Sequence, residues 1–170
     1  FRDDNISIGG GWANVGNTPF RMYKRYSHEG GIRTPLIVHW PNGITNSGRW
    51  TDQAGHVSDI MRTVVDVTGV TYPTQFNGHA VLPMEGQNLA PIFQQQPEFS
   101  RTIGFEHQNT RAWMDGQWKL VTKTASSTDG SSLADTLELY DMAVDPTELN
   151  NIAPNQPARL VAMVDAWNAW

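Results

Sequence analysis

Four side chains that can carry positive charge lie within eight residues near the start of the chain: Arg21, Lys24, Arg25 and His28. Glycines follow them directly, and aromatic and apolar residues surround them. A lysine in such surroundings is partly desolvated and binds an anionic oxygen well. The pattern is typical of a pocket for an oxyanion such as phosphate or sulfate. The alternative is a solvated charged surface, which is the commoner explanation of a run of charges taken alone.

The residues behind this cluster predict an α/β framework. Residues 34–40, TPLIVHW, are an apolar run between turn-forming residues, which predicts a strand buried on both faces. Residues 57–69 carry apolar side chains at helical spacing, with Asp59 in the first turn and Gly69 as a stop, and predict an amphipathic helix. A buried strand followed by a helix is the α/β signature. The glycines at 9–11 predict an irregular opening able to approach a ligand closely.

From about residue 76 the sequence changes character. Residues 71–98 contain four prolines and little periodicity, so we expect a surface connection with at most a short helix near 87–94. Three or four antiparallel strands are predicted over 101–141, where Asp115-Gly116 is a strong hairpin signal. Pro157 then begins a terminal helix that packs on this sheet. The fold class is therefore α/β (α+β).

Composition excludes several classes of protein. The 170 residues are 39% hydrophobic and 17% charged, as in an ordinary globular protein. The net charge of −5 argues against broad nucleic-acid binding. The absence of cysteine excludes disulfides, thiolate metal sites and a cysteine nucleophile. No apolar run is long enough to cross a bilayer, so no membrane partner is expected. The N-terminus lacks initiator Met and the apolar core of a signal peptide, which suggests the middle of a longer sequence or a processed chain; the localisation stays unknown.

Motifs along nearly the whole chain closely resemble the type I sulfatases, the formylglycine-dependent arylsulfatases of the alkaline phosphatase superfamily. The matching stretches are Gly11-Trp12-Ala13-Asn14, Asn17-Thr18-Pro19-Phe20-Arg21-x-Tyr23-Lys24, His28-Glu29-Gly30-Gly31-Ile32-x-Thr34-Pro35-Leu36-Ile37, Trp40-Pro41, His56-Val57-x-Asp59-Ile60, Val65-Asp66-x-x-Gly69-Val70-x-Tyr72-Pro73, Phe105-Glu106-His107, Arg111-Ala112, Gly116-x-Trp118-Lys119-Leu120-Val121, Glu138-Leu139-Tyr140-Asp141 and Asp145-Pro146-x-Glu148-x-Asn150-Asn151. The resemblance implies that residues 1–75 are the end of the sulfatase mixed-sheet catalytic domain. Residues 76–170 would be a C-terminal subdomain, a small antiparallel sheet packed on a terminal helix.

The resemblance also implies a mechanism. A formylglycine hydrate attacks sulfur, a Ca²⁺ ion neutralises the sulfate, and lysines and histidines bind its oxygens or protonate the leaving group. Lys24 stands where the family has its active-site lysine, five residues before the glutamate of Glu29-Gly30-Gly31. Its implied role is to bind a sulfate oxygen and the developing charge.

The remaining candidates each have a structural alternative. His28 is either a substrate contact or a packed loop histidine, and Glu29 is expected to order the glycine turn through hydrogen bonds. Glu106, His107 and Arg111 would contact the substrate or form a structural ion pair. Asp4 and Asn5 are candidate metal ligands for Ca²⁺, because some sulfatases have an Asp-Asn pair at about this distance before the lysine; the alternative is a polar loop.

The departures from the family decide what activity to expect. The signature Cys or Ser followed by x-Pro-x-Arg, which supplies formylglycine, does not occur in these 170 residues, and the paired-aspartate metal motif that the family has near its N-terminus, with the histidines and lysine of its central sheet, is missing too. We therefore expect a C-terminal fragment of an arylsulfatase-like hydrolase that has no sulfatase activity alone, and leave open whether it is an enzyme. The alternatives are a non-catalytic remnant that binds anions or a partner, and a phosphate-ester hydrolase of the same superfamily. Because the 34–40 strand would lack partners, we also expect a missing N-terminal portion, self-association into a homo-oligomer, or altered packing.

Overall fold

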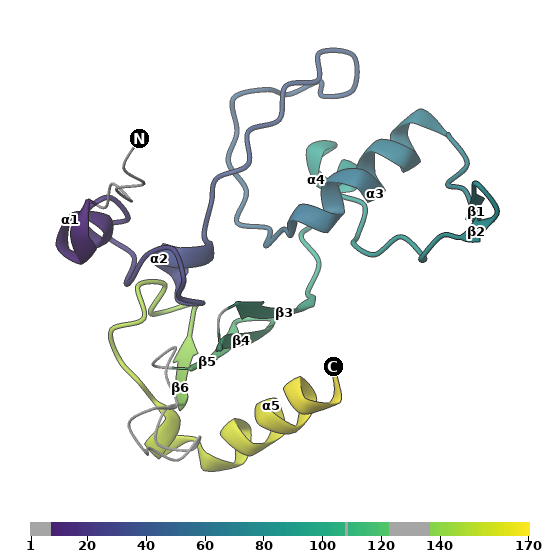
Figure 1. The fold of residues 1–170 in the computed structure, drawn as a ribbon. Coiled ribbons are helices and arrows are strands. Elements are labelled where there is room, and N and C mark those ends of the chain that lie inside the picture. The colour runs from purple at the N-terminus through teal and green to yellow at the C-terminus, as the bar shows by residue number, and fades with distance from the viewer. Residues whose placement is uncertain (1–7, 108, 123–136) are drawn as a thin grey trace, which may run out of the picture. The chain divides into compact units, whose positions relative to one another are not determined.

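The computed structural model describes residues 8–107, 109–122 and 137–170. The chain forms two units, one made of residues 1–35 with 101–170 and the other of residues 36–100. The mixture of helices with an antiparallel sheet confirms the predicted fold class (Figure 1). The predicted boundary at residue 75 concerns a complete sulfatase and stays a prediction.

A four-stranded antiparallel sheet is the centre of the first unit. Its strands are β3 (Thr102–His107), β4 (Thr110–Asp115), β5 (Trp118–Thr122) and β6 (Leu137–Asp141), and neighbours in sequence are neighbours in the sheet. Gly116 takes a φ of 57° in the turn between β4 and β5, a conformation that glycine adopts readily. The predicted hairpin at Asp115-Gly116 is therefore confirmed, as are the antiparallel strands.

One face of this sheet packs on the terminal helix α5 (Pro157–Ala169). Trp113, Leu120 and Leu139 face each other across three strands and bury their side chains with Met163 of the helix. Leu160, Val164 and Trp167 of the same helix pack at the margin, as the spacing of apolar residues predicted. Burial of this apolar surface is what holds the helix to the sheet.

The opposite face of the sheet is covered by a segment from the start of the chain (Figure 1). This segment contains the helices α1 (Gly9–Val15) and α2 (Glu29–Ile32). The expectation of an irregular opening at 9–11 was wrong, because these glycines form the first turn of α1. The helix is closed at its C-terminal end by the side-chain amide of Asn17, which donates to the Ala13 carbonyl at 2.7 Å.

The second unit contains the predicted helix, α3 (Val57–Thr68). A capping box between His56 and Asp59 begins it, and Gly69, with a φ of 68°, ends it. The apolar stripe of the helix is largely exposed, whereas Asp59 and Thr63 are buried. Those two side chains accept hydrogen bonds from the backbone N–H groups of Gln87 (2.8 Å) and Leu89 (2.9 Å), so a polar face is the one covered.

Residues 34–40 are not a strand in this structure, and the prediction of a buried strand there was wrong for this chain. They have no regular secondary structure, and the side chain of Ile37 is 90% exposed. A strand needs a neighbour to take its backbone hydrogen bonds, and none of the described strands pairs with this segment. The expected self-association stays a prediction.

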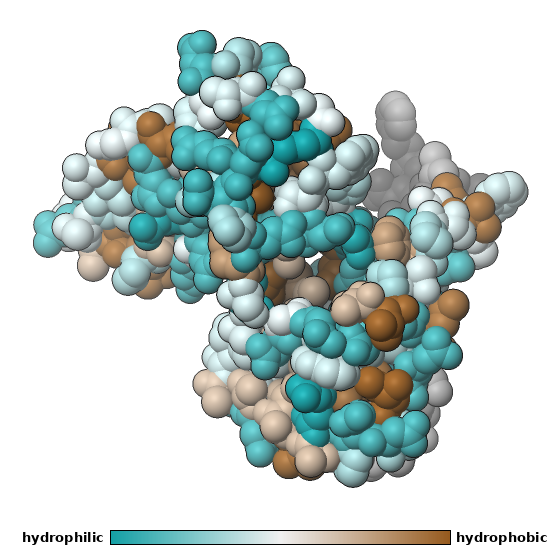
Figure 2. Space-filling model, turned by 180° about the vertical axis from the view of Figure 1, so that it is seen from behind, coloured by the Kyte–Doolittle hydropathy of each residue, from teal (hydrophilic) through white to brown (hydrophobic). Residues whose placement is uncertain are grey.

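The rest of the second unit is short elements and loops. A two-stranded ribbon joins β1 (Gln75–Phe76) to β2 (His79–Ala80), and the short predicted helix appears as α4 (Ala90–Phe93). Large hydrophobic side chains such as Trp50 and Leu82 reach the surface, and Figure 2 shows hydrophobic residues scattered among polar ones. Within the described ranges, no helix combines the length and apolar character needed to cross a membrane.

Candidate anion-binding site

Lys24 lies in the wall of a hollow of about 360 Å³. Its side chain is exposed, and no hydrogen bond or ion pair engages its ammonium among the described residues. The hollow is bounded by residues from three neighbouring parts of the first unit, namely Ile8, Trp12, Ala13, Gly16, Asn17, Tyr23, Lys24, Gly30, Gly31, Arg33 and Thr34. Two cationic residues, Lys24 and Arg33, therefore line one hollow. Their positive charges suit the binding of an oxyanion, because hydrogen bonds between ionised groups are strong.

The glycine pair of α2 makes the tight loop before it sterically feasible. A Cβ on Gly30 would overlap the carbonyl oxygens of Arg21 and Met22, and a Cβ on Gly31 would overlap that of Tyr26. The backbone of the loop thus packs directly against the helix, and the Gly30 N–H donates to the Arg21 carbonyl at 2.8 Å. Glycine is needed here for close approach.

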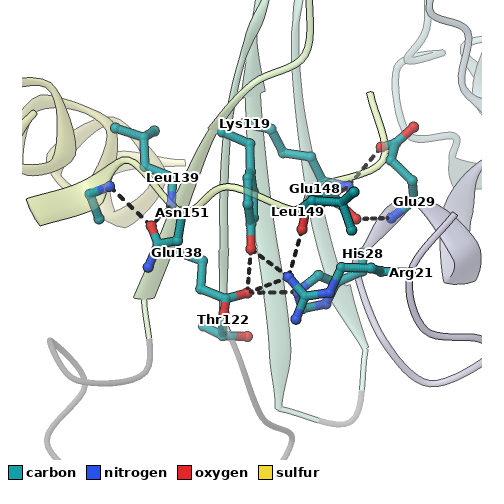
Figure 3. Close-up of polar contacts among 12 residues, drawn as sticks. Arg21, His28, Glu29, Lys119, Thr122, Glu138, Leu139, Glu148, Leu149 and Asn151 are labelled. Atoms are coloured by element: carbon teal, nitrogen blue, oxygen red, sulfur yellow. Dashed lines mark hydrogen bonds and ion pairs between the residues drawn. The ribbon is translucent and has the colours of Figure 1, made fainter. Parts of the chain in front are cut away.

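Arg21 ties the first end of the loop to the sheet (Figure 3). Its guanidinium donates to the Tyr140 hydroxyl at 2.6 Å and to the Glu148 carbonyl at 2.7 Å, and lies 3.5 Å from the Glu138 carboxylate. Tyr140 donates to Glu138 at 2.9 Å. Burial and that hydrogen bond raise the pKa of the Tyr140 hydroxyl, which therefore stays a neutral donor.

The carboxylate of Glu138 stays charged in this buried cluster. Burial raises the pKa of the Glu138 carboxyl, whereas the hydrogen bonds from His28 and Tyr140 lower it. The positive charge of Arg21 lowers it further, so the pKa lies below its ordinary value. Glu138 is thus an anion that holds its partners in place.

Glu29 ties the second end of the loop to the sheet through Lys119 (Figure 3). The ammonium of Lys119, which is fully buried, lies 2.7 Å from the carboxylates of both Glu29 and Glu148. Glu148 also accepts from the backbone N–H of Glu29 at 2.8 Å. Glu29 was expected to order the glycine turn through hydrogen bonds, and in the structure it does so by joining α2 to the sheet.

His28 lies inside this arrangement rather than on the hollow. Its side chain has no exposed surface, and Nε2 is 2.9 Å from the Glu138 carboxylate. Next to it, Ser27 donates to the Thr110 hydroxyl at 3.1 Å. The structure thus places His28 as a packed loop histidine, the alternative to a substrate contact.

The other three predicted substrate contacts lie on β3 and β4 and do not line the hollow. Glu106 and Arg111 are cross-strand partners 3.8 Å apart, on the face of the sheet that packs on α5. The Arg111 guanidinium lies over the ring of Trp167 at 4.3 Å. His107 is exposed at the end of β3, on the opposite face. A role for these three residues with the substrate stays a prediction.

The expected Ca²⁺ ion stays a prediction, because the described residues do not test it. They contain no group of three or more His, Cys, Asp or Glu side chains arranged to hold a metal ion. Asp4 and Asn5, the two predicted ligands, lie outside the described residues.

Sequence patterns alone did not identify several residues that form the site. Arg33 lines the hollow although it occupies a variable position of the motif, and Lys119 and Glu148 are too distant in sequence from Glu29 for any spacing rule to join them. The resemblance to the sulfatases was the signal that could have identified them, because the stretches around Lys119, Tyr140 and Glu148 belong to that resemblance.

Comparison with known proteins agrees with this arrangement. A family model described as N-sulphoglucosamine sulphohydrolase, C-terminal, matches residues 20–165, which include Lys24 and the whole buried cluster. An uncharacterised sulfatase of Schizosaccharomyces pombe is 29% identical over 171 residues, covering 95% of this chain and 29% of that protein. Arylsulfatase K of Xenopus laevis is 25% identical over 150 residues, covering 84% of this chain and 26% of that protein.

Two solved structures share the fold. The protein Ps i-CgsB, which has also been solved with k-i-k-neocarrahexaose, matches 91% of this chain and 32% of its own, with a TM-score of 0.65 and 21% identity. A sulfatase from the metabolism of multiple glycosaminoglycans by Bacteroides thetaiotaomicron matches 86% of this chain and 30% of its own, with a TM-score of 0.60 and 22% identity. This chain thus spans less than a third of the length of these relatives.

Proposed function

The chain belongs to the family described as N-sulphoglucosamine sulphohydrolase, C-terminal, and on this premise we propose that it is the part of an arylsulfatase-like sulfuric ester hydrolase that binds a sulfate oxygen through Lys24. The observation that carries the proposal is the position of Lys24. Its ammonium, which has no hydrogen-bond or ion-pair partner among the residues that the structure describes, belongs to a residue that lines the same hollow as Arg33, inside the region that matches the family model.

The chemistry of Lys24 follows from its charge and its surroundings. An ammonium can donate up to three hydrogen bonds and is a compact positive charge, which suits the oxygens of a tetrahedral anion. Charge that develops on a sulfate oxygen during S–O cleavage is stabilised best by a group already in place. Arg33 also lines the hollow and would hold a second oxygen while its guanidinium stays 3.5 Å from the Glu29 carboxylate.

In this proposal, the covalent nucleophile of the reaction is not among these 170 residues. The sequence has no Cys or Ser followed by x-Pro-x-Arg, the stretch that supplies formylglycine in the family. A covalent nucleophile divides a difficult step into two easier ones, and its loss removes several orders of magnitude in rate. The chain by itself would bind the anion without turning it over.

A sulfate titration of the 170-residue chain, followed by the amide chemical shifts of residues 20–34, tests the proposal. We expect shifts in this stretch, and we expect Lys24→Gln to weaken the response about tenfold, as for loss of one charge-assisted hydrogen bond. Arg25→Gln is the matched control, because it removes the same charge from an exposed neighbour that does not line the hollow. Equal losses in the two variants, or shifts confined to another part of the chain, would contradict the assignment.

A further inference from the structure

We propose that Arg21 and Glu29 are positioning residues for Lys24, which fasten both ends of its loop to the sheet and so hold the ammonium in the wall of the hollow. The inference rests on the proposed function, since it concerns the same lysine. Neither residue would contact the anion in this role; each would act through the place it gives to Lys24.

The first observation is that hydrogen bonds and an ion pair hold the loop to the sheet on both sides of Lys24. None of these contacts involves the Lys24 side chain. Arg21, three residues before it, donates to the Tyr140 hydroxyl at 2.6 Å and the Glu148 carbonyl at 2.7 Å. Glu29, five residues after it, meets the buried Lys119 ammonium at 2.7 Å. All of these partners belong to the sheet or to the turn after β6.

The second observation is that the two ends are also joined to each other. The Gly30 N–H donates to the Arg21 carbonyl at 2.8 Å, which closes the loop at its base. Within the loop the Tyr26 N–H donates to the Tyr23 carbonyl at 3.1 Å. The Arg25 carbonyl, next to Lys24, also accepts from the Thr110 hydroxyl at 2.8 Å. Lys24 is therefore an exposed residue of a closed loop that is bound to the sheet on both sides of it.

The third observation concerns the kind of anchor. Lys119 is 0% exposed and shared between two carboxylates at 2.7 Å. Buried ion pairs of this kind add little net stability compared with apolar residues of the same shape, because removing charges from water is costly. Such ion pairs instead fix the orientation of the groups that they join, because charged hydrogen bonds have narrow geometric requirements. An anion site needs such a support, because a displacement of about 1 Å can cost about 100-fold in function.

The test is a double-mutant cycle on sulfate binding by the 170-residue chain. The initial slope of the amide shifts of residues 20–34 against sulfate concentration is measured for wild type, Arg21→Gln, Lys24→Ala and the double variant. We expect Arg21→Gln to lower the slope about three- to tenfold when Lys24 is present. In the Lys24→Ala background the same change should lower it no further, because the group being positioned is absent.

Three further variants separate positioning from loss of charge or stability. Arg25→Gln removes one charge from the loop without removing an anchor and should leave most of the slope. Met163→Ala weakens the core under α5, on the other face of the sheet, and should leave the slope unchanged while lowering the unfolding midpoint. Glu29→Gln keeps the shape of the second anchor and should lower the slope as Arg21→Gln does; it replaces that variant if Arg21→Gln does not fold.

The outcomes are distinct for the two proposals. If Lys24→Ala leaves the slope unchanged, the proposed function is contradicted. If Lys24→Ala lowers the slope but Arg21→Gln and Glu29→Gln do not, the proposed function stands and the positioning role is overturned. An equal loss from Arg21→Gln with and without Lys24 overturns the positioning role as well, since it would show that Arg21 acts on the anion independently.

Discussion

Both faces of the four-stranded sheet bury apolar side chains, Ala112, Val121 and Tyr140 on the face opposite α5, but among the described residues that face also carries fully buried ion pairs. One face buries Trp113, Leu120 and Leu139 against Met163 of α5, a contact between apolar side chains that has no required direction. The other face presents Lys119 and Glu138 to charged and polar groups of the loop that carries Lys24, with hydrogen bonds at 2.7 and 2.9 Å. The same strands therefore support a helix by burial and a loop by directed bonds.

The difference shows why the two attachments tolerate change differently. An apolar core can repack around a smaller side chain and keep its overall arrangement. A buried charged group that loses its partner cannot be satisfied by a small movement, so its loss is felt in full. The attachment of the loop that carries Lys24 is thus more sensitive to substitution than that of α5. Residues of this loop line the hollow.

Lys119→Ala should be the most damaging single change to the polar face. It leaves the carboxylates of Glu29 and Glu148 buried without their shared cation, at a cost of about 3 to 5 kcal/mol in the free energy of unfolding. Urea denaturation followed by tryptophan fluorescence measures this loss. Lys119→Met combined with Glu29→Gln and Glu148→Gln is the control, and should recover most of the stability because none of these three positions then carries a buried charge without its partner. A triple variant as unstable as Lys119→Ala would contradict the charge explanation.

Met163→Ala should be the corresponding change on the apolar face, with a somewhat smaller effect. Removing this buried side chain should lower the free energy of unfolding by about 2 to 4 kcal/mol, from lost burial and the space left behind. The same denaturation experiment checks it. Unlike the changes on the polar face, it should leave the amide spectrum of residues 20–34 in place. Broad shifts in that stretch would show that the two faces are coupled.

The smallest of the three expected effects concerns the pH dependence of stability, to which Glu138 on the polar face contributes. The pKa of Glu138 is lower in the folded chain than its ordinary value of 4.5, so its charged form stabilises the fold above that pH. This contribution should be lost as the pH falls below about 4.5 and through the folded-state pKa. Glu138→Gln should therefore flatten the acid side of the stability profile, measured as the unfolding midpoint at several pH values. An unchanged acid limb would mean that other carboxylates account for it.

Local sequence was sufficient wherever an element depends on its own residues. The helix over Val57–Thr68 follows from its capping box and terminal glycine, and the hairpin at Asp115-Gly116 follows from a turn that glycine allows. The terminal helix was also predictable, because its apolar stripe has one sheet to pack on. Lys24 was singled out by the resemblance of its stretch to the sulfatases rather than by local propensity, and its role stays a prediction.

Only the tertiary structure decided what these elements touch. Residues 34–40 have the composition of a buried strand, but strand formation needs a neighbour, and no described strand pairs with them. Periodicity placed a helix at α3 but could not say that Asp59 and Thr63 would be its covered side chains, because that depended on distant backbone N–H groups. The link from Glu29 to Lys119 likewise spans 90 positions. Spacing rules act over a few residues, whereas the energy of a buried ion pair depends on distances in space, which the chain reaches only by folding.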